Sequence, residues 1–233
     1  MHHVVLERWS RGASPLHARD ARVKILAALA WLAAIGTTAH ISPLIAGCYA
    51  AALVAAAAVA RLPVGGVLLR AAAVLPFSAT FALMSVVAGD NARAAALVSK
   101  SYLSAVTVLV LAGTTPLPKL LGGFEWLRVP RALTLVVQFL YRYLFVISEQ
   151  AQHMRMAALS RALQSRKTRV AMAGAVATLF ARSHARAEGI HAAMLARGFA
   201  GRIEPLAAAR IGAADVLFLL TGLLLAAGLR VLS

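Results

Sequence analysis

Apolar stretches of about twenty residues recur along this chain, and their length constrains the fold more than any other feature of the sequence. A helix needs this length to cross the hydrocarbon core of a bilayer. The stretches that qualify are residues 24–39, 41–60, 67–88, 95–112 and 213–232. The first is short and must tilt or thin the bilayer to cross it. We therefore expect an all-α integral membrane protein with about five transmembrane helices.

The basic residues are distributed unevenly, and their distribution predicts an orientation. Residues 119–210 hold fourteen of the twenty-four Lys and Arg residues against four acids. Basic segments next to membrane spans stay on the cytoplasmic side. This block and the N-terminal segment with Arg8, Arg11, Arg19, Arg22 and Lys24 are therefore predicted to be cytoplasmic. Five crossings then leave the C-terminus outside. Aromatic residues make up only 6% of the chain, so we do not interpret the net charge of +16 as a nucleic-acid interface.

Residues 132–147 are also apolar, but a crossing there would place the basic residues 155–210 outside. We therefore predict a long cytoplasmic-side helix whose apolar stripe packs under the bundle or in the membrane interface, with Gln138 and Arg142 on its polar side. Three parts follow. Residues 1–113 form an N-terminal cytoplasmic segment and four transmembrane helices, 114–211 a cytoplasmic coupling domain of amphipathic helices, and 212–233 the final transmembrane helix.

Small residues recur every fourth position at Gly47, Ala51 and Ala55. This spacing lets helices approach closely in lipid, either inside the chain or against another membrane subunit, and we favour packing inside the chain. The single cysteine, Cys48, is expected to fill the core.

The sequence lacks the motifs of several functional classes. It has no phosphate-binding loop of the G-x-x-x-x-G-K-[ST] type, so it cannot by itself hold ATP. No carboxylate lies near the centre of a predicted span, as a secondary carrier usually requires. Neither a catalytic constellation nor a dense cluster of metal ligands is present. We therefore expect no enzyme, and no metal or cofactor bound by this chain.

A weak duplication connects two segments of the basic block, Leu159-Ser160-Arg161-Ala162-Leu163 and Leu195-Ala196-Arg197-Gly198-Phe199. Gly198 suits the position just after a helix, because glycine adopts the left-handed conformation without strain. Arg197 would then lie in the last turn, where the helix dipole favours a cation and a guanidinium can reach a partner's carboxylate. In the first copy Ala162 replaces the glycine, so that helix is predicted to continue through Leu163. Both arginines could instead only hold the chain at the membrane surface.

The run from Gly189 to Gly201 resembles the second Ala-Arg-Gly signature of the transmembrane T component of energy-coupling factor transporters, the CbiQ/EcfT family. Further stretches resemble that family in the same order: Ser14-Pro15-Leu16-His17 with Asp20, Arg22 and Lys24; Thr114-Thr115-Pro116 through Leu127-Arg128-Val129-Pro130; and Tyr141-Arg142-Tyr143-Leu144-Phe145 with Glu149 and Arg155. The chain departs from the family at Arg19, Ala21 and Lys119 and in the Ser160-Arg161-Ala162 copy.

The resemblance implies a non-catalytic subunit of the bacterial inner membrane that couples two cytoplasmic ABC ATPases to a separate substrate-binding membrane protein, the S component. The ATPases would hold ATP and Mg, and a small accessory membrane subunit is a further candidate partner. Arg161 and Arg197 would meet the ATPases together with Ser160, Ala162, Ala196 and Gly198, supported by Arg142, Arg155, Met194, Leu195 and Phe199. Leu6-Glu7-Arg8-Trp9-Ser10 and the Tyr-Arg-Tyr stretch are most like the cobalt branch, ahead of nickel and biotin. The alternative of a different class is a self-sufficient channel or secondary carrier.

Overall fold

The computed structural model describes residues 7–38, 42–160, 168–201 and 212–231, and within these ranges all the regular structure is helical. The all-α class predicted from the sequence is confirmed. The chain divides into two compact units: residues 1–127 with 208–233, and residues 128–207. The boundaries predicted from the sequence, 1–113, 114–211 and 212–233, stay a prediction.

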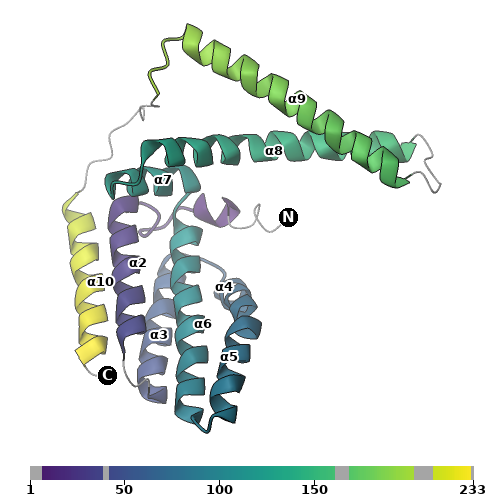
Figure 1. Ribbon diagram of the computed structural model, residues 1–233. Helices are drawn as coiled ribbons and strands as arrows, with labels where there is room; N and C mark the ends of the chain where they lie inside the picture. The colour runs from purple at the N-terminus through teal and green to yellow at the C-terminus, as the bar shows by residue number, and fades with distance from the viewer. Residues whose placement is uncertain (1–6, 39–41, 161–167, 202–211, 232–233) are drawn as a thin grey trace. The chain divides into compact units, whose positions relative to one another are not determined.

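The first unit is a helical bundle (Figure 1). Its helices are α2 (Ala21–Thr37), α3 (Pro43–Val59), α4 (Val64–Ala71), α5 (Leu75–Val87), α6 (Asn91–Thr114), α7 (Leu117–Trp126) and α10 (Ala213–Val231). A 3-10 turn, Ala72–Val74, joins α4 to α5. It falls just before Pro76, which has no N–H to donate to the carbonyl of Ala72. Helix α6 packs against α2, α3, α4 and α5.

Within the described ranges, length and composition identify four segments that could cross a membrane: Val64–Val87, Asn91–Thr114, Arg131–Ala158 and Ala213–Val231. Helix α3 is a shorter apolar helix. The first expected span corresponds to α2, which begins earlier than expected and carries Arg22 and Lys24 in its first turn. The chain is thus a multi-pass membrane protein. The segment Arg131–Ala158 meets the same criteria, so its predicted placement beside the membrane rests on the charge distribution.

The core of the bundle centres on Trp31 and Tyr49. Their rings meet edge to face with centroids 5.8 Å apart, which is a favourable aromatic geometry. The indole Nε1 of Trp31 donates a hydrogen bond to the Gly222 carbonyl of α10 over 3.1 Å. This bond ties α10 to α2, although most of the chain separates the two helices in sequence.

Two lysines close the ends of each other's helices. Lys24, on the first turn of α2, is only 5% exposed and donates to the Thr114 carbonyl at the end of α6 over 3.0 Å. Lys100, on α6, donates to the Thr38 carbonyl at the end of α2 over 2.6 Å. The last carbonyls of a helix have no partner within the helix, and they favour a cation. Each helix of this pair therefore supplies the cap of the other.

The residues before α2 pack against α4. The Trp9 ring lies beneath the guanidinium of Arg70, 4.4 Å from the ring centroid. The His17 ring bridges Ser14 Oγ at 2.7 Å and the Trp9 carbonyl at 2.9 Å. The contact between Trp9 and Arg70 holds the N-terminal segment against α4, and the bonds of His17 fix the conformation of that segment.

Two expectations about α3 are wrong. Gly47, Ala51 and Ala55 are exposed, and no side chain or backbone atom lies within 4 Å of a Cβ placed on Gly47. The small-residue face therefore does not pack inside this chain. Cys48 is exposed as well and does not fill the core. The buried face of α3 consists of Ile45, Tyr49, Leu53 and Ala57 instead.

Candidate functional site

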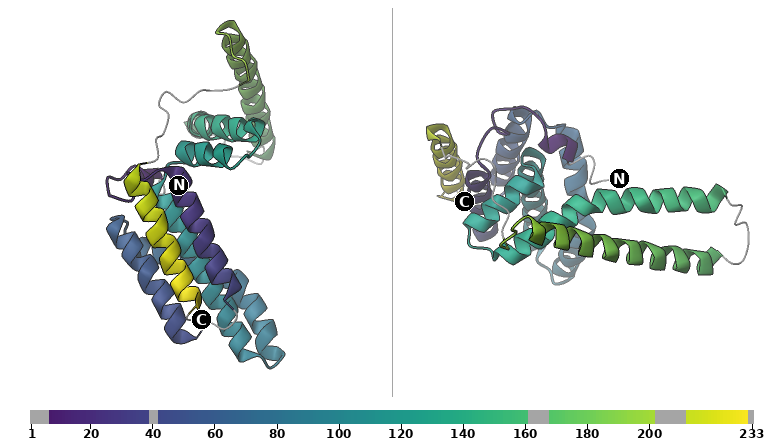
Figure 2. Two further views of the ribbon diagram at one scale, coloured as in Figure 1. Left: turned by 90° about the vertical axis from the view of Figure 1, so that its left-hand side faces the viewer. Right: turned by 90° about the horizontal axis from the view of Figure 1, so that it is seen from above.

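The second unit contains two long helices, α8 (Arg131–Ser160) and α9 (Thr168–Ala196). They run in opposite directions and lie side by side over part of their length (Figure 2). Helix α8 begins directly after Pro130, whose carbonyl accepts hydrogen bonds from the amides of Leu133 and Thr134. Proline suits this place because its missing N–H is not needed at the start of a helix.

The end of α9 forms a Schellman cap around Gly198. Gly198 has φ +78°, the left-handed conformation that glycine adopts without strain. The Phe199 amide donates to the Met194 carbonyl over 3.0 Å, and the Gly198 amide donates to the Leu195 carbonyl over 2.9 Å. This is the hydrogen-bond pair that defines the motif. The glycine cap predicted from the sequence is therefore present.

Arg197 is the last residue before this glycine, and its side chain is exposed. Among the described residues, none forms an ion pair with it. The carbonyl end of α9 supplies a partial negative charge that favours a cation at this position. The arrangement presents a guanidinium that can make a two-pronged contact with a carboxylate on another molecule.

A groove of about 300 Å³ lies between α8 and α9. Its lining is mainly apolar: Phe139, Tyr143 and Ile147 come from α8, and Ala187, Ile190 and Met194 come from α9. The rings of Phe139 and Tyr143 stack with centroids 6.3 Å apart. Arg186 and His191 add polar groups to the lining. His191 and Met194, which precede Arg197 by six and three residues, both line the groove.

The remaining predicted residues lie on both helices. Arg142, Arg155, Ser160 and Ala196 are exposed, Leu195 is 55% exposed, and Met194 and Phe199 are half-buried. The Ser160 hydroxyl donates to the Met156 carbonyl over 3.0 Å. Arg161, Ala162 and the expected continuation of α8 through Leu163 lie outside the described residues. That Arg161 forms a second contact end like Arg197 therefore stays a prediction.

No group of three or more His, Cys, Asp or Glu residues gathers in the described part of the chain in a way that could hold a metal ion. The described residues offer an exposed arginine, basic helices and an apolar groove. These features suit contacts with other proteins.

Two polar clusters of the bundle escaped the sequence analysis. One is the lysine pair, because Lys24 was interpreted only as a topology signal and as part of the family resemblance. The other is Asp215, which is buried in the first turn of α10 and accepts from the Asp20 amide. A signal did exist, since an acid in the first turn of a helix often bonds the amides there. Nothing in the sequence says, however, that the start of α2 lies beside it.

A family model described as a cobalt transport protein, CbiQ, matches residues 12–207. The cobalt transport protein CbiQ of Rhodobacter capsulatus is 34% identical over 153 residues, which cover 64% of this chain and 62% of that protein. An uncharacterized protein of Methanocaldococcus jannaschii is 32% identical over 102 residues, 43% of this chain and 38% of its own length. The chain thus spans less than two thirds of either relative.

Proposed function

Because the chain belongs to the CbiQ family of cobalt transport proteins, we propose that it is the T component of an energy-coupling factor importer. In this role it joins two cytoplasmic ABC ATPases, which hold ATP and Mg, to a separate substrate-binding membrane subunit. The chain itself catalyses no reaction. A small accessory membrane subunit is a further candidate member of the complex.

The observation that carries this proposal is the exposed Arg197 on the capped end of α9. The cap fixes the backbone of the last turn, so the Arg197 side chain leaves the helix end from a defined position. An acidic groove on an ATPase would desolvate such a contact, and breaking a buried charge pair of this kind typically costs about 2–5 kcal/mol. Arg161 is proposed as the matching contact to the second ATPase.

The charge distribution supports an orientation with the α8–α9 unit in the cytoplasm. Helices α2 and α10 begin, and α3 and α6 end, at one end of the bundle (Figure 1). The basic residues of that end are Arg8, Arg11, Arg19, Arg22, Lys24, Arg61, Arg70 and Lys119, whereas Arg93, Lys100 and Arg230 belong to the other. Under the positive-inside rule the first end faces the cytoplasm, and the last residues of α10 face outward.

The apolar surfaces of α8 and α9 support contact with the substrate-binding subunit. Leu133, Val136 and Leu140 are all more than half exposed on α8. Exposed apolar area of this kind indicates an interface with protein or lipid. We propose that it bears on the membrane subunit, so that ATP-driven closure of the ATPases tilts these helices and moves that subunit.

Cobalt ion is the proposed substrate, on the strength of the family description and the name of the Rhodobacter capsulatus relative. Nickel ion and biotin are the next candidates. In this arrangement a separate subunit recognises the substrate, so this chain determines it only indirectly.

Co-purification tests the role. The tagged chain is co-expressed with candidate ATPases and substrate-binding subunits, and we expect both kinds of subunit to purify with it. Arg197→Glu should weaken ATPase binding by roughly 30-fold or more, while the protein still inserts. Arg182→Glu, an exposed arginine of the same helix, is the matched control and should retain the ATPases. Full ATPase binding by an Arg161→Glu, Arg197→Glu double variant would refute the proposed role of these arginines.

Uptake by vesicles that contain the whole complex then identifies the substrate. We expect ATP-dependent accumulation of Co²⁺ but not of Ni²⁺ or biotin. ATP-independent transport by the chain alone would favour the channel or secondary-carrier alternative.

A further inference from the structure

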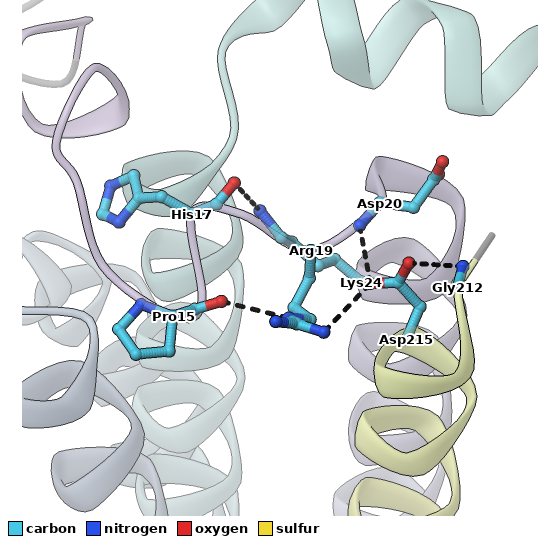
Figure 3. A network of polar contacts seen from close by, with 7 residues as sticks. All are labelled: Pro15, His17, Arg19, Asp20, Lys24, Gly212 and Asp215. Atoms are coloured by element: carbon cyan, nitrogen blue, oxygen red, sulfur yellow. Dashed lines mark hydrogen bonds and ion pairs between the residues drawn. The ribbon is translucent and has the colours of Figure 1, made fainter. Parts of the chain in front are cut away.

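One carboxylate joins the starts of two bundle helices. Asp215 lies in the first turn of α10 and is only 8% exposed. Its Oδ2 accepts a hydrogen bond from the Gly212 amide over 3.0 Å, and its Oδ1 accepts one from the Asp20 amide over 3.2 Å (Figure 3). Gly212 immediately precedes α10, and Asp20 is the N-cap of α2. The same side chain thus satisfies an amide at the start of each helix, where amides lack partners within the helix.

Positive charges lie around Asp215. Helices α2 and α10 run in the same direction, so the positive ends of both helix dipoles converge on this carboxylate (Figure 1). Arg19 adds a positive charge, with its Nη1 3.7 Å from Oδ1 and both side chains mostly buried. Arg19 is itself held by a hydrogen bond from its Nε to the Pro15 carbonyl over 3.2 Å.

Asp20 cannot take over this task. Its own carboxylate accepts the Arg22 amide over 2.8 Å and caps α2. The link between the two helix starts therefore depends on Asp215, with Arg19 as its charge partner. We call the contacts of Asp215 with Gly212, Asp20 and Arg19 the carboxylate clamp.

The clamp lies where the chain returns to the bundle. Helix α9 ends at the proposed ATPase contact, and residues 202–211 then lead to Gly212 and α10. The chain passes between the two units at two places, ahead of α8 and ahead of α10, and the clamp lies at the second. It ties this entry point to α2, which packs against both α6 and α10. A force that arrives at Gly212 is therefore borne by the bundle and not by the first turn of α10 alone.

We propose that Asp215 is a positioning residue that anchors the start of α10 to α2, so that movement of the α8–α9 unit is transmitted to the substrate-binding subunit rather than lost in α10. This inference rests on the proposed T-component function. Loss of the clamp should uncouple the transporter, because the ATPases would still bind and hydrolyse ATP while their motion dissipates in the loosened connection.

The test uses the complete complex in vesicles and measures substrate imported per ATP hydrolysed. Asp215→Asn removes the charge, and we expect the ratio to fall by at least about fivefold, the lower end of typical coupling between sites. The ATPase rate and subunit content should stay near those of the wild type. Asp215→Glu keeps a carboxylate that can still reach the first-turn amides, and it should restore most of the ratio.

Asp90→Asn is the matched control. Asp90 caps α6 by accepting the Arg93 amide over 2.8 Å, but it lies at the other end of the bundle and does not contact the returning chain. This variant should leave the ratio unchanged. If Asp215→Asn is not recovered as an assembled complex, Arg19→Gln provides the test, because it keeps both amide contacts of Asp215 and removes the ion pair together with the bond to Pro15. We expect a smaller fall of the ratio in that variant.

The outcomes separate the two proposals. An unchanged ratio in the recovered clamp variant overturns the anchoring role of Asp215. A proportional fall of both ATPase rate and import also overturns it, because it indicates a purely structural residue. A wild-type chain that binds no ATPase refutes the T-component function itself.

Discussion

Two adjacent glycines of α7 provide a sharp test of how this helix packs on α2. A Cβ on Gly123 would lie 2.6 Å from the Ile25 Cδ1 atom, closer than carbon atoms approach, and Ile25 is only 2% exposed. Gly122 points away, and no atom lies within 4 Å of a Cβ placed there. Gly122→Ala should therefore stabilise α7, whereas Gly123→Ala forces the buried Ile25 side chain to shift in a filled core.

The magnitudes follow from two opposing contributions. Alanine in place of glycine inside a helix gains about 1 kcal/mol, and this gain is common to both variants. Overpacking a filled core costs about 1–3 kcal/mol and affects only Gly123→Ala. The two variants should therefore differ by about 1–3 kcal/mol in the free energy of unfolding. At 2–4 °C per kcal/mol, Gly123→Ala should lose its native form at a temperature about 2–12 °C below that of Gly122→Ala.

The assay heats detergent-purified protein and measures the fraction that remains monodisperse by size-exclusion chromatography. Comparing the two alanine variants with each other cancels the helix-propensity contribution. Equal midpoints for both variants would refute the close contact between Gly123 and Ile25.

Three further outcomes follow from local contacts. Gly198→Ala should destabilise the end of α9 by about 1–2 kcal/mol because Gly198 has a left-handed φ, whereas Gly189→Ala inside the helix should stabilise it. Hydrogen exchange of residues 190–201 distinguishes the two variants, and equal exchange in both would contradict the cap. Trp31→Phe removes the hydrogen bond to Gly222 and should lower the free energy of unfolding by about 0.5–1.5 kcal/mol, which the heating assay detects as a lower midpoint temperature. An unchanged midpoint would show that this bond contributes nothing to stability. Lys100→Met leaves the end carbonyls of α2 without their cation and should lower the same midpoint by more than Lys100→Arg does; equal effects would argue against the cap.

Features that depend on local sequence were predictable. The apolar spans follow from length and composition, and the glycine cap at Gly198 follows from a few neighbouring residues. The exposed face of α3 was mispredicted for a physical reason. In a bilayer the outward face of a helix is as apolar as its buried face, so hydropathy does not say which way Gly47 or Cys48 points.

Features that depend on distant residues were not predictable. Asp215 meets the amide of Asp20 across 195 positions, and Lys24 meets Thr114 across 90. Sequence periodicity reports the faces of single helices, not which helix ends become neighbours. The polar clusters therefore emerged only once the bundle was assembled.

The reciprocal lysine caps have a consequence for how this protein is made. Helix α2 leaves the ribosome long before α6. Its C-terminal carbonyls and the ammonium group of Lys24 therefore lack their partners until α6 has been synthesised. Unpaired polar groups are costly in a bilayer, and α2 is therefore left incomplete during synthesis. Arrival of α6 satisfies both helix ends in a single step. Biogenesis of the bundle should thus contain a late checkpoint, at which membrane insertion of the first span becomes permanent only when the fourth is in place.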